Sequence, residues 1–78
     1  MKVYQLTCED ASHLGGSMGT EYTTHVFTNA FTDLDKAKAY AVKYADGFPY
    51  WARWEGTPDN TYVDCGAYIF TIKKQAVL

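Results

Sequence analysis

The chain has 78 residues, of which 47% are hydrophobic, 17% aromatic and 21% charged. This length suits one compact domain, and the composition is too apolar for a disordered chain, so we expect a single domain over residues 1–78. Seven Lys and Arg residues against nine Asp and Glu give a net charge of −2. This balance argues against a nucleic-acid binder, which usually presents a basic face to the phosphates.

The N-terminal ten residues contain no apolar core of a signal peptide, and no run of about 18 apolar residues follows. We therefore expect a cytoplasmic protein without a membrane-spanning helix. Cys8 and Cys65 are the two cysteines. In a reducing compartment they are expected to be buried thiols, with a disulfide or a metal or reactive role as alternatives.

Catalytic and metal-binding motifs are not apparent. His13 and His25 are the two histidines, and with Cys8 and Cys65 they offer zinc-ligand types without the closely spaced pairs of structural zinc sites. No local motif indicates a Cys–His catalytic pair. The glycine-rich run 15–19 lacks the Lys-Ser/Thr ending of a phosphate loop. We expect no enzyme activity, no cofactor and no metal.

Two strands are predicted in the first third of the chain. Residues 1–8 alternate with apolar side chains on one face, and residues 21–31 are rich in Thr, Val, Tyr and Phe. Between them, residues 11–20 contain three glycines and two serines, which is typical of a loop. Met18 is the adaptable apolar side chain of this loop and a candidate partner contact.

A helix is predicted over residues 33–46. Thr32 is expected as the N-cap and Asp35 as the capping-box acid, whereas Gly47 suits the left-handed residue after the helix. An apolar stripe runs along the segment at helical spacing: Leu34, Ala37, Ala41, Tyr44 and Ala45. Its small alanines imply that the helix approaches a sheet closely.

Two more strands are predicted after the helix, over residues 50–55 and 61–73. The run GTPDN at 56–60 predicts a turn between them, since Pro58 presets φ. The apolar pattern of the last strand changes phase near Gly66, which indicates a β-bulge there. Residues 75–78 are expected to be a frayed tail.

The predicted order is β-β-α-β-β. We expect an α+β fold with a four-stranded, mostly antiparallel sheet and one helix packed on one face, which leaves the other face to water. The first and last strands, or the two strands flanking the helix, can be neighbours. A long exposed edge strand would favour a homodimer over a monomer.

The candidate binding residues centre on the aromatic run YWARWE at 50–55. In a strand, Trp51, Arg53 and Glu55 share one face, and Trp beside Arg on an open face is typical of a protein-binding hot spot. A Trp half covered by neighbours is the structural alternative. The expected contact surface combines Trp51 and Arg53 with residues of the turn and loop: Asp59, Asn60, Tyr62 and Met18.

The run VFTNAFTDLDKAKAYAVKYADGFPYWARWE at 26–55, a strand feeding a capped helix and an aromatic strand, resembles small phage-encoded host-takeover proteins. These include anti-CRISPR proteins and inhibitors of host RNA polymerase, and they act by occluding a functional surface of a host protein. The resemblance implies a small inhibitor that binds a host protein or protein complex in the host cytoplasm. A single-stranded nucleic-acid-binding module that stacks bases on exposed aromatics is the alternative.

Overall fold

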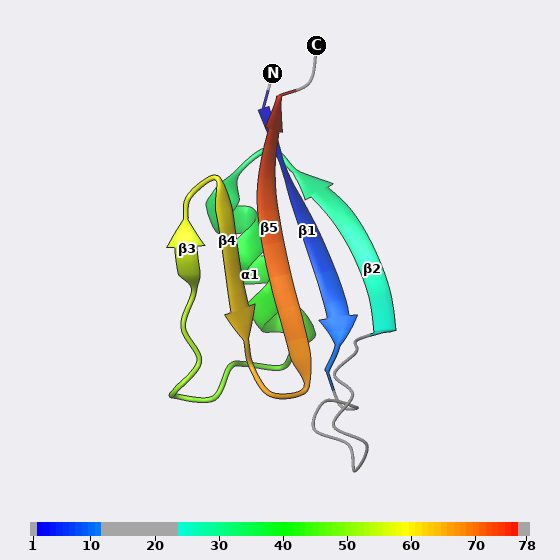
Figure 1. Cartoon of the computed structure of the whole chain (residues 1–78), viewed down its shortest axis with the longest axis vertical. Coiled ribbons are helices and arrows are strands. Elements are labelled where there is room, and N and C mark those ends of the chain that lie inside the picture. The colour runs from blue at the N-terminus through cyan, green and yellow to red at the C-terminus, as the bar shows by residue number, and fades with distance from the viewer. Residues whose placement is uncertain (1, 12–23, 77–78) are drawn as a thin grey trace.

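The computed structural model describes residues 2–11 and 24–76, which form one antiparallel sheet and one helix (Figure 1). The elements are β1 (Lys2–Asp10), β2 (Thr24–Phe31), α1 (Leu34–Tyr44), β3 (Glu55–Thr57), β4 (Asn60–Asp64) and β5 (Tyr68–Ala76). The α+β class is confirmed, but the sheet has five strands where four were predicted. Met18, with residues 12–23, lies outside the described residues.

The sheet order is β2-β1-β5-β4-β3, so the first and last strands are the central neighbours. β1 and β5 pair over their whole length, from Lys2↔Ala76 to Asp10↔Tyr68. Residues 75 and 76 therefore belong to β5, and the prediction that they are a frayed tail is wrong. β2 and β3 form the two edges of the sheet.

The predicted strand over 61–73 is two strands joined by a hairpin turn. β4 pairs with β5 from Asn60↔Lys73 to Asp64↔Ile69. Between them the Cys65 amide donates to the Tyr68 carbonyl at 3.0 Å, and Gly66 has a φ of 97°. The change of phase at Gly66 thus marks a reversal of the chain, and the expected bulge is wrong.

The predicted strand over 50–55 is also wrong. Residues 50–54 are irregular, and only Glu55 belongs to the short β3, which continues to Thr57. β3 and β4 are joined by Pro58 and Asp59, inside the predicted turn, with Thr57↔Asn60 as the closing pair. A β-carbon on Gly56 would stand 2.4 Å from the Asn60 carbonyl oxygen, so only glycine fits beside this turn.

The helix starts one residue later and ends two residues earlier than predicted, and both capping positions are displaced by one residue. Asp33, not Thr32, is the N-cap, and its carboxylate accepts a hydrogen bond from the Asp35 amide at 2.9 Å. At the other end Asp46 takes the left-handed position, with a φ of 58°, and Gly47 follows it. The amides of Asp46 and Gly47 donate to the carbonyls of the last turn, which makes a Schellman motif.

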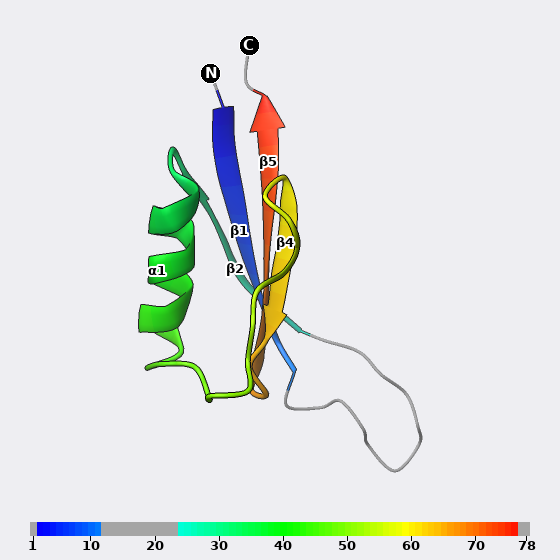
Figure 2. The ribbon, with the colours of Figure 1, turned by 90° about the vertical axis from the view of Figure 1, so that its left-hand side faces the viewer.

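The helix packs on one face of the sheet, over β1, β2 and β5 (Figures 1 and 2). Ala37 and Ala41 are fully buried in this contact, as the alanine stripe predicted. Opposite them the sheet contributes the fully buried side chains of the core: Leu6, Cys8, Val63, Phe70 and Ile72. Small residues on the helix let its backbone approach these larger side chains of the sheet.

The other face of the sheet is polar. A shallow hollow on it is lined by alternate residues of β1 and β5: Gln5, Thr7, Glu9, Thr71, Lys73 and Gln75. Large aromatic rings gather instead on the helix side, where Phe27 lies 4.8 Å and 5.6 Å from the rings of Tyr44 and Tyr40. On the open face the ring of Tyr62 in β4 is exposed, because it points away from the buried Thr61 and Val63. The exposed Trp51, in the segment between α1 and β3, lines a second hollow together with Tyr62.

Candidate functional site

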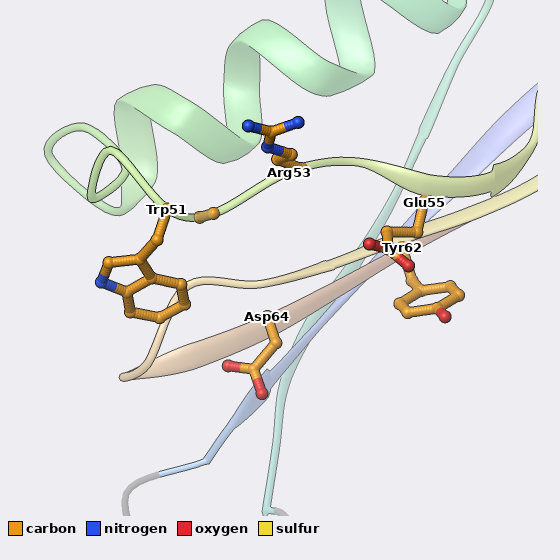
Figure 3. Close-up of a pocket in the computed structure, with 6 residues that line it drawn as sticks. Trp51, Arg53, Glu55, Tyr62 and Asp64 are labelled. Carbon is orange, nitrogen blue, oxygen red and sulfur yellow. The ribbon is translucent and has the colours of Figure 1, made fainter.

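A shallow hollow lies where the segment after α1 passes the hairpin of β3 and β4 (Figure 3). It has a volume of about 150 Å³ and is lined by Trp51, Ala52, Arg53, Glu55, Tyr62 and Asp64. Trp51 and Tyr62 are 53% and 47% exposed, so two large rings stand half in solvent at one site. We refer to these six residues as the Trp51–Tyr62 hollow.

The segment 48–54 presents Trp51 because its two ends are anchored. Phe48 stacks on the buried Phe70 with a centroid distance of 5.8 Å, and it contacts Trp54 at 5.9 Å. Phe48 and Trp54 thus belong to the rim of the core. Between these anchors the Ala52 amide donates to the Pro49 carbonyl at 3.0 Å, and this turn leaves Trp51 on the outer side.

Trp51 rests on the turn between β4 and β5. Its Cη2 and Cζ2 atoms lie 3.7 Å and 3.8 Å from where a β-carbon on Gly66 would stand. The Gly66 amide donates to Oδ1 of Asp64 at 2.9 Å, which fixes one carboxylate oxygen of Asp64 beside the ring. The ring and the carboxylate are therefore held by the same tight turn.

Glu55 and Tyr62 are placed by the strand register. They are direct cross-strand partners in β3 and β4, and Asp64 follows Tyr62 by two residues on the same face of β4. The buried Thr61 hydroxyl donates to the Glu55 carbonyl, which ties the start of β3 to β4. The hollow thus carries two carboxylates and two aromatic rings on regular or tightly turned backbone.

The predicted contact residues separate into two groups. Trp51, Arg53 and Tyr62 line the hollow, although the Arg53 guanidinium points away from Tyr62 and Asp64 (Figure 3). The expectation that Trp51 and Arg53 share one strand face fails, because that segment is not a strand.

Asp59 lies in the turn between β3 and β4 and Asn60 begins β4, and neither residue lines the hollow. Asp59 is tied to β5 instead, since its Oδ1 lies 3.4 Å from Nζ of Lys74 and its carbonyl accepts from the Lys74 amide. The side-chain hydrogen bond from Nζ of Lys74 to the Asp59 carboxylate is the main cause that raises the pKa of Lys74.

Asp64 is the site residue that sequence reasoning missed, and Glu55 was expected on the same face as Trp51 and Arg53 but not counted among the contact residues. The alternation in the run 60–64 was a usable signal, because it puts Tyr62 and Asp64 on the face opposite to the buried Thr61 and Val63. The predicted turn at 56–60 would pair Glu55 with Thr61, and only the observed two-residue turn, with Thr57 opposite Asn60, places Glu55 across from Tyr62. The alternation alone indicates that Asp64 stands beside Tyr62, whereas the position of Glu55 depends on the exact length of the turn.

The two cysteines are buried and free, as expected for structural thiols. Burial is the main cause that raises the pKa of Cys8 to about 11, and the neighbouring Cys65, Asp10 and Glu9 raise it further. Cys8 therefore stays protonated at neutral pH and is a poor nucleophile. His25 is exposed and shares a hydrogen bond of 2.8 Å with the Thr28 hydroxyl.

Within residues 2–11 and 24–76, no group of three or more His, Cys, Asp and Glu side chains is arranged to hold a metal ion. No helix among these residues is long and apolar enough to cross a membrane. Comparison of the chain with protein-family models, curated proteins and solved structures finds no match.

Proposed function

We propose that this domain is a non-enzymatic protein-binding module that attaches to a partner through the Trp51–Tyr62 hollow. By covering a functional surface of that partner it acts as an inhibitor, in the manner of the phage-encoded host-takeover and anti-CRISPR proteins that its layout resembles. The observation that carries the proposal is the pair of half-exposed rings, Trp51 and Tyr62, beside charged side chains in one hollow. Aromatic residues and Arg are the residue types that dominate binding energy at protein interfaces.

The two rings are held in place by the backbone beneath them, which favours an interface over incidental exposure. Trp51 lies on the tight turn at Gly66, and Tyr62 stands on β4 in the sheet. Binding therefore costs little side-chain ordering, which otherwise weakens association. Tyr50 provides the contrast, because it is 97% exposed and lines no part of the hollow.

A single-stranded nucleic-acid module is the weaker proposal. Two exposed rings are a platform on which bases can stack. However, the hollow also carries the carboxylates of Glu55 and Asp64, which repel a phosphate backbone. Binding of single-stranded DNA at low salt that weakens with added salt would favour this alternative over a protein partner.

Affinity capture from a bacterial lysate followed by mass spectrometry tests the proposal. We expect at least one protein to be retained by the wild type and by Tyr50→Ala, but lost with Trp51→Ala and with Tyr62→Ala. Tyr50→Ala is the matched control, because it removes an exposed ring of the same segment from outside the hollow. Failure to recover any protein that depends on Trp51 or Tyr62 at micromolar bait contradicts the proposal.

A further inference from the structure

The Trp51–Tyr62 hollow has the size and chemistry of a receptor for a single positively charged side chain. We propose that it receives an arginine side chain of the partner protein, whose guanidinium stacks on Trp51 or Tyr62 and pairs with the carboxylates of Glu55 and Asp64. This inference rests on the proposed function, and it names the group that the hollow recognises.

The volume of the hollow limits what it can hold. Sites for small-molecule ligands enclose about 300–1,000 Å³, whereas this hollow measures about 150 Å³ and is open to solvent. It is therefore too small for a cofactor or metabolite of that class. One side chain presented by a larger molecule is the ligand that fits this space.

The charge of the hollow selects a cation. Neither Glu55 nor Asp64 has an ion-pair partner among the residues that the structure describes. Oδ1 of Asp64 accepts from the Gly66 amide, which leaves its other oxygen for a ligand. The Arg53 guanidinium points away from this carboxylate and does not neutralise it (Figure 3). A cationic group from a partner thus supplies the charge that this chain leaves uncompensated.

The aromatic walls favour arginine over lysine. A guanidinium is planar, so it stacks on the indole of Trp51 or the phenol ring of Tyr62 while its N–H groups reach a carboxylate in the same plane. A lysine ammonium is a more strongly hydrated point charge, so its transfer into the hollow costs more, and it offers no plane that stacks on a ring. Two carboxylates beside two rings, as in this hollow, match the guanidinium better.

The inference is tested by NMR titration of the ¹⁵N-labelled protein with N-acetyl-arginine amide as the probe. We expect saturable shifts at the Trp51 indole N–H and at the amides of residues 62–66, with a Kd on the order of 1–10 mM. N-acetyl-lysine amide should bind several-fold more weakly, and neutral N-acetyl-glutamine amide should give no saturable shift. Equal responses to the arginine and glutamine probes, or tighter binding of the lysine probe, overturn the inference.

Variants that remove the carboxylate charges of the hollow but keep the fold test the role of these charges. Glu55→Gln combined with Asp64→Asn should weaken the arginine probe about 5- to 10-fold, because both carboxylates are lost. Asn retains an oxygen that can accept from the Gly66 amide, so the turn at 65–67 should persist. Asp35→Asn is the matched control, since it removes one exposed carboxylate that does not line the hollow. It should leave the Kd unchanged, and equal weakening by both substitutions contradicts a local site.

The outcome is distinguishable from that of the proposed function. If lysate capture yields a partner that depends on Trp51 while the probes show no preference for arginine, the hollow binds protein but not through a guanidinium. If the probes show the expected preference while no partner depends on Trp51, the recognition chemistry stands and the inhibitor proposal fails.

Discussion

The indole of Trp51 lies against Gly66, so that a β-carbon on residue 66 would stand 3.7 Å from Cη2 of the ring. This distance is an ordinary van der Waals contact. The φ of Gly66 is 97°, a backbone conformation that residues with a β-carbon rarely adopt. The turn that supports the indole therefore depends on glycine for its backbone conformation rather than for space.

The first prediction tests whether position 66 needs glycine for its backbone conformation or for the space beside Trp51. Gly66→Ala should lower the free energy of unfolding by about 1–2 kcal/mol, because alanine is strained at this φ. Gly47 is the matched comparison: its φ is 92°, and nothing lies within 4 Å of the position of its β-carbon. Gly47→Ala should cost about the same in urea unfolding. A much larger loss for Gly66→Ala would show that the contact with Trp51 is tighter than the distances indicate.

The end of α1 provides the second prediction. Asp46 has a φ of 58° and places a negative charge at the carboxyl end of the helix, where the dipole disfavours it. Asp46→Gly should therefore raise the free energy of unfolding by about 0.5–1 kcal/mol. Asp46→Ala removes the charge but keeps a β-carbon, so its free energy of unfolding should be well below that of Asp46→Gly. Equal stability of the two variants in thermal unfolding would contradict the role of the backbone conformation.

Close packing of the helix on the sheet is the basis of the third prediction. Ala41 has no exposed surface, whereas Ala39 on the same helix is exposed. Ala41→Leu should destabilise the fold by about 1–3 kcal/mol, since added methylene groups have to be forced into a packed contact. Ala39→Leu is the control and should change stability by less than about 0.5 kcal/mol. Urea unfolding of both variants measures the difference. Coinciding midpoints would contradict close packing of α1 on the sheet at Ala41.

The helix could be predicted because several independent signals agree in that segment. Its apolar stripe, its acidic start and the Gly-Phe-Pro sequence after it all indicate the same element, and Ala37 and Ala41 are buried as predicted. The cap was displaced by one residue because Thr32 and Asp33 are both good N-cap residues. Only the hydrogen bond from Asp35 to Asp33 decides between them.

The segment after the helix could not be predicted, because its alternation imitates a strand. Tyr50, Ala52 and Trp54 alternate with polar and aromatic residues, but Phe48 and Trp54 pack towards the core and Trp51 does not. That arrangement depends on Phe70 and Gly66, which are distant in the sequence. Local patterns carry no information on such contacts, so the irregular path of residues 50–54 cannot be derived from them.

The fourth prediction concerns alkaline pH. The pKa of Cys8 is about 11 in the folded protein against 9.0 for the unperturbed thiol. Between these values the unfolded chain loses the proton while the folded protein keeps it, so rising pH favours unfolding. Below pH 9 this contribution is fully present, and it is lost progressively towards pH 11. The two-unit difference corresponds to up to about 2–3 kcal/mol.

Cys8→Ala provides the comparison for that measurement. The two proteins share every other titratable side chain, so the difference between wild type and Cys8→Ala isolates the thiol. We expect the wild type to lose about 2 kcal/mol more than Cys8→Ala when urea unfolding is compared at pH 8 and pH 10.5. Parallel losses in the two proteins would contradict a buried, protonated thiol at position 8.

The central claim is that the Trp51–Tyr62 hollow is the surface that binds a partner. Its most direct test is the Kd of the captured partner for the wild type, Trp51→Ala and Tyr50→Ala, measured by calorimetric titration. Truncation of a hot-spot ring to alanine should weaken the binding free energy by about 2 kcal/mol or more, which is about 30-fold in Kd. We therefore predict that Trp51→Ala weakens binding by at least about that factor while Tyr50→Ala leaves it within about twofold. A folded Trp51→Ala protein that binds the partner as tightly as the wild type would contradict the claim.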